Sequence, residues 1–271
     1  DGCSWNECTF CEMYTAPQKK FRARDEAEVL ESIRLTGERY GDQVRRIFLA
    51  DGDATVLSTR RLLAILQAIK AHMPAVRRIS SYCLPRNLRK KSQAEVNELA
   101  AAGLSMVYVG AESGDDQVLA AVHKGETFES TREALDKLGM AGITRSVMIL
   151  NGLGGKVYSR QHAENSARLA NATQPEYLAT LVVSFPLGEQ RFRAGFPAWE
   201  PLTQHELFVE TEQLLSALEL KRTVFRSDHA SNWLVLKGTL GADKERLLAQ
   251  VHQAIENPEK AHLRPAWARG L

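Results

Sequence analysis

Three cysteines lie close together near the start of the chain, at Cys3, Cys8 and Cys11. They are five and three residues apart, so a short loop carries three thiolates that could wrap around one metal centre. A structural zinc ion takes four protein ligands, and the three ligands of a catalytic zinc ion usually include a histidine. The nearest further candidates, His72 and Cys83, are far along the chain. Three thiolates without a fourth ligand instead suit an iron–sulfur cube, whose remaining iron stays open to another molecule.

Two simpler interpretations of these cysteines remain. A residue distant in sequence could complete a zinc knuckle, or the three thiols could hold no metal. Anaerobic metal analysis separates the possibilities, because a cube gives about four irons per chain and a knuckle gives zinc.

The overall composition is that of an ordinary globular protein. The chain has 271 residues, of which 44% are hydrophobic and 25% are charged, enough to bury a large core. The net charge is +2 with acids and bases interleaved, which favours a small-molecule substrate over nucleic acid. No apolar run approaches the ~18 residues of a membrane span. Clustered cysteines without a signal peptide fit a reducing compartment, so we expect a cytoplasmic protein that binds no membrane.

Short apolar runs alternate with amphipathic segments over the first two thirds of the chain. The predicted strands are residues 46–50, 76–82, 106–110, 144–150 and 177–183. The predicted helices are residues 26–40, 58–72, 92–102, 116–122, 128–140 and 159–172, with Ser58 as a cap and Gly103 as a stop. This alternation implies parallel strands joined by right-handed crossovers. By itself it leaves open a barrel, closed partly or wholly, and a doubly wound sheet.

Polar or glycine-rich segments follow three of the predicted strands. They are Asp51, Gly52 and Asp53 after the first strand, Glu112 and Ser113 after the third, and Asn151 and Gly152 after the fourth. In a barrel of strand–helix units, functional residues gather at the carboxyl ends of the strands. Each segment also has a structural interpretation, as an Asp-Gly turn, a helix cap or a lone glycine-rich turn. Their common position favours a shared binding site.

The cysteine loop, GCSWNECTFCEMY, resembles the cluster loop of radical S-adenosylmethionine (radical SAM) enzymes. That family's usual pattern is Cys-x3-Cys-x2-Cys with an aromatic residue before the last cysteine, a position that Phe10 takes here. The first gap in this chain is four residues instead of three. The strand-end segments follow in the order that the family shows, and the resemblance covers residues 2–185.

The resemblance implies a fold and an activity. The fold is a partial (β/α)6 TIM-like barrel, an α/β architecture, whose first strand we expect to be missing from the numbered chain. The activity is reductive cleavage of S-adenosylmethionine by a [4Fe–4S] cluster on Cys3, Cys8 and Cys11, with an external electron donor such as flavodoxin or ferredoxin. The resulting 5′-deoxyadenosyl radical would abstract hydrogen from a small-molecule substrate. The alternative is a non-catalytic haem or cluster carrier, or a chaperone, on the same scaffold.

The resemblance also implies which residues contact S-adenosylmethionine. Phe10 would lie beside the adenine, and the turn from Asp51 to Asp53, similar to a Gly-Gly-Glu motif, would bind the methionine amino group. Glu112 and Ser113, in a Gly-x-Glu-Ser-Gly run, would contact the ribose or the methionine part. The segment from Asn151, which partly matches a glycine-rich motif, would pack on the adenine.

The chain changes character after Pro186. We expect residues 1–186 to form the core barrel and residues 187–271 a mainly helical C-terminal extension that covers the substrate side. Residues 187–201 are predicted as a loop, and residues 222–238 as an irregular stretch between helices. The latter contains polar residues that could bind a substrate, with His229 as a candidate donor or proton shuttle. An exposed polar loop beside Trp233 is the competing interpretation. The general layout also resembles oxygen-independent coproporphyrinogen oxidase-like proteins, although this chain has no clear Gly-Gly-Gly-Thr segment.

Overall fold

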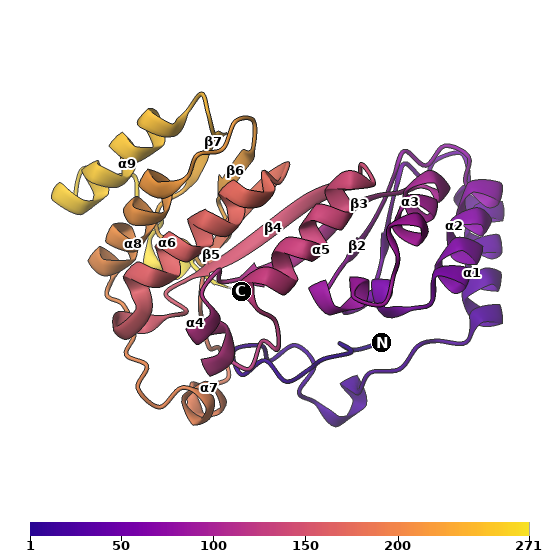
Figure 1. Cartoon of the computed structure of the whole chain (residues 1–271), viewed down its shortest axis with the longest axis horizontal. Coiled ribbons are helices and arrows are strands. Elements are labelled where there is room, and N and C mark those ends of the chain that lie inside the picture. The colour runs from indigo at the N-terminus through magenta and orange to yellow at the C-terminus, as the bar shows by residue number, and fades with distance from the viewer. Residues whose placement is uncertain (271) are drawn as a thin grey trace. The chain divides into compact units, whose positions relative to one another are not determined.

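The computed structural model describes residues 1–270 of the chain (Figure 1). Its strands form a seven-stranded sheet in the order β1-β2-β3-β4-β5-β6-β7. The pairs β1–β2, β2–β3, β4–β5 and β5–β6 are parallel, whereas β6 and β7 are antiparallel. Because β1 and β7 are the two edges of this order, the sheet is open among the described residues, as in a partial barrel. The predicted mixed α/β class is confirmed.

The chain folds into two compact units, each built from several stretches of sequence. The first unit contains Asp1–Asn6, Met13–Val109 and Glu133–Arg145, and the second contains Glu7–Glu12, Gly110–Arg132 and the chain from Ser146 onward. The cysteine loop is therefore divided, with Cys3 in the first unit and Cys8 and Cys11 in the second.

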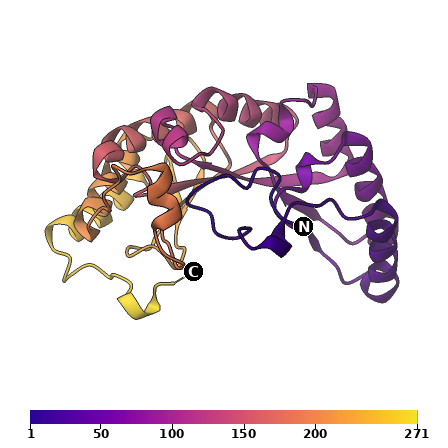
Figure 2. The same cartoon turned by 90° about the horizontal axis from the view of Figure 1, so that it is seen from below.

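The first unit consists of parallel strands with helices packed beside them. Its elements are β1 (Arg46–Leu49), β2 (Arg78–Tyr82), β3 (Leu104–Glu112) up to Val109, α1 (Glu26–Tyr40), α2 (Thr59–His72), α3 (Gln93–Ala102), α5 (Phe128–Met140) from Glu133, the first two residues of β4 (Thr144–Asn151) and the short turns η1 (Pro17–Lys19), η2 (Ala54–Val56) and η3 (Pro85–Leu88). Figure 2 turns the chain so that it is seen from the end where the N-terminal segment, in indigo, lies. Ser58 caps α2 by accepting a hydrogen bond from the Arg61 amide, and Gly103 ends α3 in the left-handed conformation. Both boundaries agree with the sequence prediction.

The second unit contains the remaining strands and most of the helices. Its elements are the end of β3, α4 (Asp116–Ala121), the start of α5 (Phe128–Met140), most of β4 (Thr144–Asn151), α6 (Gly155–Thr173), β5 (Tyr177–Val182), α7 (Gln190–Gly195), α8 (Gln204–Ala217), β6 (Val224–Ser227), β7 (Leu236–Thr239), α9 (Lys244–Glu256) and η4 (Ala266–Ala268). One core cluster of this unit is formed by Val118, Val122, Leu153, Phe192, Phe196 and Trp199, and Phe10 of the cysteine loop packs against it. Hydrophobic packing therefore ties the loop to α4, α7 and the turn after β4.

Two segments differ from the sequence prediction. The stretch expected to be an irregular region over residues 222–238 contributes β6 and β7 to the sheet. The predicted loop over residues 187–201 contains the short helix α7, whose Phe192 is fully buried. Both segments are short, with strands of four residues and a helix of six, so their apolar patterns were too brief to recognise.

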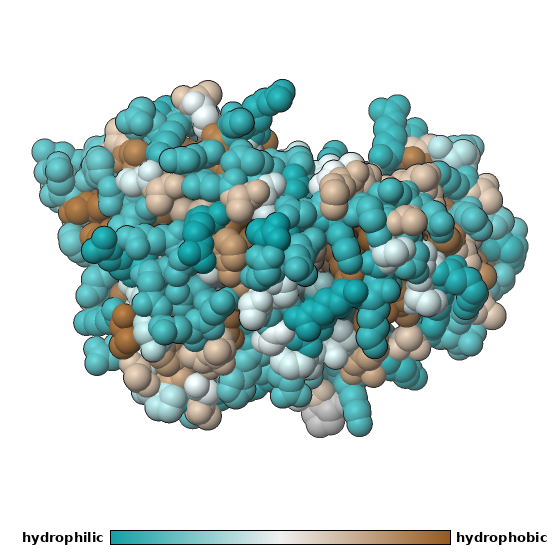
Figure 3. All heavy atoms as spheres, in the orientation of Figure 1, coloured by the Kyte–Doolittle hydropathy of each residue, from teal (hydrophilic) through white to brown (hydrophobic). Residues whose placement is uncertain are grey.

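Hydrophilic residues cover most of the face shown in Figure 3, with hydrophobic residues scattered among them. Within residues 1–270, no helix is both long and apolar enough to cross a membrane.

Candidate functional site

The turn after β1 holds the beginning of the cysteine loop in the first unit. The Asp53 side chain is buried and accepts hydrogen bonds from the Ser4 amide at 2.9 Å, from the Ser4 hydroxyl and from the Asn87 side-chain amide at 3.1 Å. Ser4 directly follows Cys3. The predicted acidic residue of this turn thus fixes the backbone beside the first cysteine.

Gly52 allows the same turn to lie directly against the loop. Its φ is +26°, and a Cβ atom there would lie 1.8 Å from the Gly2 carbonyl oxygen and 3.0 Å from the Cys3 Cα. No residue with a side chain could occupy this position without displacing the loop. The Asp-Gly turn that the sequence places after this strand therefore packs against the chain that carries Cys3.

Tyr14 closes the other end of the loop onto the same turn. Its hydroxyl donates to Asp51 Oδ1 at 2.7 Å and accepts from the Gly52 amide at 3.0 Å. This hydrogen bond lowers the pKa of Asp51, while burial and then the bond to Asp51 raise the pKa of Tyr14. The pair is thus held as a phenol and a carboxylate. Nothing in the sequence pattern singled out Tyr14.

The second half of the cysteine loop is held by α4 and α7 in the second unit. The Thr9 amide donates to the Val122 carbonyl at 3.0 Å, and the Arg191 guanidinium donates to the Cys11 carbonyl. A Cβ on Gly195 would lie 2.8 Å from the Thr9 methyl carbon, so α7 packs closely on the loop. The segment predicted as a plain loop is therefore part of the frame around two of the cysteines.

Lys124 is a buried cation beside this half of the loop. Its side chain is 5% exposed, and its Nζ donates to Glu112 Oε1 at 3.1 Å. Burial alone would lower the pKa of Lys124, but the negative charges of Glu112, Cys8 and Glu126 outweigh it and keep the pKa above its usual value. Its Nζ also lies 5.8 Å from the centre of the Phe10 ring. Lys124 follows α4 in a segment that belongs to no sequence motif.

Ser113 is fully buried, and its hydroxyl is engaged inside the protein. It accepts a hydrogen bond from the Asp115 amide at 3.0 Å and is 2.8 Å from His162 Nδ1. His162 Nε2 faces Glu210 Oε1 at 4.0 Å, which favours the tautomer with its hydrogen on Nε2 and a Ser113 hydroxyl that donates to Nδ1. Asp115, rather than Ser113, caps α4 with its side chain.

The turn after β4 is fixed by α8 and a tryptophan. The Gly152 amide donates to Glu210 Oε1 at 2.6 Å, and its carbonyl accepts from Trp199 Nε1 at 3.1 Å. The Asn151 side-chain amide donates to the Thr211 hydroxyl at 3.2 Å. Because these polar groups are used inside the protein, Asn151 and Gly152 can offer a ligand mainly van der Waals contact.

His229 lies in the bend after β6. Its Nδ1 accepts from the Ser231 amide at 3.1 Å, and Arg264 donates to its backbone carbonyl. Burial, followed by the nearby positive charge of Arg264, lowers the pKa of His229. The imidazole is therefore mainly neutral at neutral pH, a state in which it can accept a proton.

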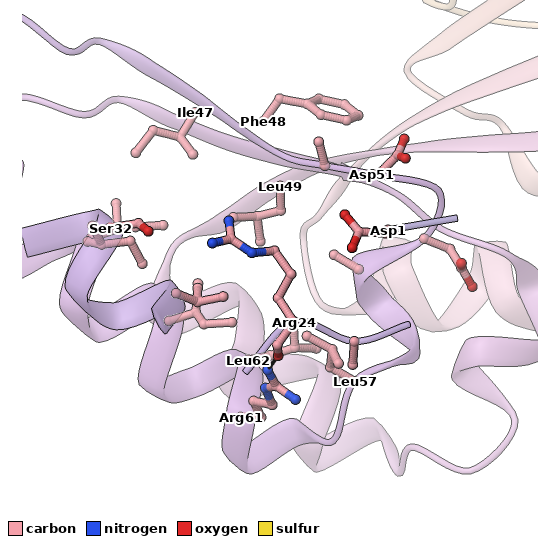
Figure 4. Close-up of a pocket in the computed structure, with 18 of the residues that line it drawn as sticks. Asp1, Arg24, Ser32, Ile47, Phe48, Leu49, Asp51, Leu57, Arg61 and Leu62 are labelled. Atoms are coloured by element: carbon pink, nitrogen blue, oxygen red, sulfur yellow. Dashed lines mark hydrogen bonds between the residues drawn. The ribbon is translucent and has the colours of Figure 1, made fainter. Parts of the chain in front are cut away.

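A cavity of about 520 Å³ lies in the first unit beside β1, α1 and α2 (Figure 4). Ile47, Leu49 and Leu62 contribute apolar surface, and the labelled Phe48 points away to the opposite side of β1. Asp51 lies at one end of the cavity, but its carboxylate is occupied by Tyr14.

The opposite side of β1 to β3 carries an aromatic cluster. Phe48, Tyr82 and Tyr108 stand on adjacent strands with ring centres 5.0 to 6.1 Å apart, and Phe48 and Tyr82 are exposed. Ser81, which precedes Tyr82, is fully buried and donates to the Leu49 carbonyl at 3.2 Å.

The cysteines have the donor chemistry of an iron–sulfur site. None of the four cysteines forms a disulfide, and Cys3 and Cys11 are partly exposed. Across residues 1–270, no three cysteine, histidine, aspartate or glutamate side chains are gathered into a ready-made metal site. The fit of a cluster thus rests on three cysteines without disulfide bonds on one anchored loop, with the buried Lys124 cation to offset negative charge.

The family model of the radical SAM superfamily matches residues 1–170. The chain belongs to the radical SAM superfamily. Radical SAM proteins use a [4Fe–4S] cluster and S-adenosylmethionine, and these are the cofactors of this chain. The family is generally one of enzymes.

Solved structures of radical SAM proteins share the fold. Coproporphyrinogen III oxidase (HemN) from Escherichia coli superposes with a TM-score of 0.59 at 14% identity, covering 80% of this chain and 51% of that protein. The methyltransferase TsrM from Kitasatospora setae, with tryptophan and a SAM analogue bound, gives a TM-score of 0.52 at 22% identity, covering 66% of this chain and 34% of that protein. Methylornithine synthase (PylB) gives 0.54 at 14% identity, covering 97% of this chain and 71% of that protein.

These similarities establish the fold and not a shared reaction. The chain spans about a third of the length of TsrM and about half that of HemN. Among curated proteins, no sequence matches the chain.

Proposed function

We propose that the chain is a radical SAM enzyme that cleaves S-adenosylmethionine reductively and removes hydrogen from a small-molecule substrate. The observation that carries this proposal is the anchoring of the cysteine loop. Asp53 and Tyr14 hold it in the first unit, and Val122 and Arg191 hold it in the second. Each part of the loop is thus held within its own unit by a strand-end turn or a helix end, and such support from neighbouring residues is what orients metal ligands.

Cys3, Cys8 and Cys11 would hold the cluster through their thiolates. When bound, the cluster supplies an electron that breaks a carbon–sulfur bond of S-adenosylmethionine, giving methionine and a 5′-deoxyadenosyl radical. The electron would come from an external donor such as flavodoxin or ferredoxin. The residues of this chain would bind and orient S-adenosylmethionine and the substrate, and they would exclude water from the site.

The acidic side chains would bind the polar parts of S-adenosylmethionine. Asp53 already accepts three hydrogen bonds, which leaves about one of its roughly four acceptor positions for the methionine amino group. Glu112 binds Lys124 through Oε1, so its Oε2 can accept from an amino group or a ribose hydroxyl.

The remaining residues would shape the cofactor site. Phe10 can pack an aromatic face against the adenine, and the surface of the Asn151–Gly152 turn can contact it without polar bonds. Ser113, with its hydroxyl occupied by His162, would contribute by holding the end of β3 in place. His229 is the candidate proton donor or acceptor toward the substrate.

The test is to purify the protein anaerobically and to replace each loop cysteine by alanine. The wild-type protein should hold about four irons per chain and release 5′-deoxyadenosine after reduction with dithionite. Cys3→Ala, Cys8→Ala and Cys11→Ala should each lose that release. Cys83→Ala is the matched control, since Cys83 is buried outside the loop, and it should keep the iron and the product.

Two outcomes would contradict the proposal. Product formation by a triple alanine variant with reconstituted iron would exclude the three cysteines as the ligands. Iron binding without 5′-deoxyadenosine would favour the non-catalytic carrier, and one zinc per chain would favour a zinc knuckle.

A further inference from the structure

We propose that Lys124 is a positioning residue, which fixes the Glu112 carboxylate and supplies the positive charge that eases reduction of the cluster on Cys8. This inference rests on the proposed function, because it assigns a role toward the cluster of that same site. It goes further by naming a residue outside the cysteine loop and the strand-end motifs.

Burial makes the charge of Lys124 effective. Its side chain is 5% exposed and that of Glu112 is 13% exposed, with 3.1 Å between Nζ and Oε1. A buried ammonium group is costly unless it is paired, and a charge shielded from water acts more strongly on its neighbours. The two charges are therefore held in fixed positions, unlike those of a mobile ion pair on the surface.

The backbone around Glu112 is shaped to receive this pair. Glu112 has φ +64°, a left-handed conformation that is uncommon for a residue other than glycine. At Gly110, a Cβ atom would lie 2.1 Å from Glu112 Oε1 and 3.5 Å from Lys124 Nζ. The absence of a side chain at Gly110 thus leaves room for the Glu112 carboxylate to contact Lys124. An ion pair on the exposed surface would not require such space.

Lys124 also lies near the half of the cysteine loop that carries Cys8, since its Nζ is 5.8 Å from the centre of the Phe10 ring. Burial lowers the pKa of the lysine, and negative charge on Glu112, Cys8 and Glu126 acts in the opposite direction. The turn that carries Lys124 is also bonded to the cysteine loop, since the Thr9 amide donates to the Val122 carbonyl. Lys124 therefore pairs with a predicted S-adenosylmethionine ligand and lies close to the loop segment that carries a predicted cluster ligand.

The physical consequence concerns the reduction potential. Reduction adds an electron to a centre that already carries thiolate charge, and net charge near a cluster is one of the factors that set its potential. A fixed cation stabilises the reduced form more than the oxidised form, so its loss should make the cluster harder to reduce. Removal of Glu112 alone should act in the opposite direction.

The experiment is a redox titration of the reconstituted protein with dithionite, followed by electron paramagnetic resonance. Lys124→Met should lower the reduction equilibrium constant about tenfold, which corresponds to about 59 mV for one electron. Lys124→Arg, which keeps the charge, should stay within about threefold of wild type. Lys91→Met is the matched control, because Lys91 is also buried but donates to the Leu57 carbonyl, and it should not change the potential.

Lys124→Met leaves a buried carboxylate without its partner and could prevent folding. Glu112→Gln and the double variant Glu112→Gln/Lys124→Met therefore complete the set. The double variant should be harder to reduce than Glu112→Gln, and this comparison isolates the charge of the lysine. S-adenosylmethionine affinity, measured on the same proteins, should fall about tenfold in Glu112→Gln and in Lys124→Met.

The results separate this inference from the proposed function. The role of Lys124 alone would be overturned if the wild type binds a cluster but the lysine does not affect the reduction potential. In that case Glu112→Gln and the double variant would have the same potential, and Lys124→Met would have the same potential as Lys91→Met. A wild-type protein that binds no iron–sulfur cluster would overturn the proposed function together with this inference.

Discussion

Replacing Glu210 by alanine should destabilise the second unit more than any ordinary surface change on the same helix. The Glu210 side chain is 1% exposed and accepts from the Gly152 amide and the Ser159 hydroxyl, each at 2.6 Å. Hydrogen bonds to a charged group contribute about 1.5–3 kcal/mol each, and the loss is partly offset because the buried carboxylate disappears. We expect a net loss of about 2–4 kcal/mol in the free energy of unfolding.

The assay is urea unfolding followed by circular dichroism, together with hydrogen exchange at the Gly152 amide. Glu210→Gln keeps an acceptor for that amide and should cost only about 1 kcal/mol. Glu212→Ala, at a more exposed position of α8, should change stability by no more than about 0.5 kcal/mol. If Glu210→Ala is as stable as Glu212→Ala and leaves the Gly152 amide equally protected, the reasoning on this buried carboxylate is wrong.

Two further changes test other parts of the structure. Gly52→Ala should lower the free energy of unfolding by about 1–3 kcal/mol and reduce the iron bound, because its methyl group would lie 1.8 Å from the Gly2 carbonyl oxygen. A variant with wild-type unfolding and wild-type iron content would argue against this contact. Burial lowers the pKa of His229, so the unfolded chain binds more protons, and the stability that the neutral side chain gives above about pH 6.5 is lost as the pH falls. Between about pH 7 and pH 5, wild type and the exposed control His205→Asn should therefore lose stability more steeply than His229→Asn, and equal slopes would refute this account.

The sequence predicted those features that depend on local patterns. The first five strands and the helices between them were found because apolar periodicity repeats within each segment. The cysteine spacing and Gly52 were recognised for the same reason, since three thiols in one loop and a glycine after a strand are visible without knowledge of the fold. The structure adds which part of the chain Gly52 contacts, namely the backbone of Gly2 and Cys3.

The residues that were missed act through contacts between distant parts of the chain. Lys124 and Tyr14 belong to no motif, and their partners Glu112 and Asp51 lie 12 and 37 residues away. Glu210 resembled an ordinary charged residue of an amphipathic helix. Its place between the buried Leu207 and Leu214 was a signal, because an acid on the apolar face of a helix needs a buried partner.

The contact of Gly110 with the Glu112–Lys124 pair has a consequence for how these positions can vary. A side chain at Gly110 would occupy the place of the Glu112 carboxylate and displace it from Lys124, whereas the backbone of Gly110 needs no unusual angle. Gly110→Ala should therefore be harmful while Glu112 is present and nearly neutral once position 112 carries a small residue. In a family of sequences, these three positions should be inherited as a set, and a substitution at one should predict the residues found at the other two.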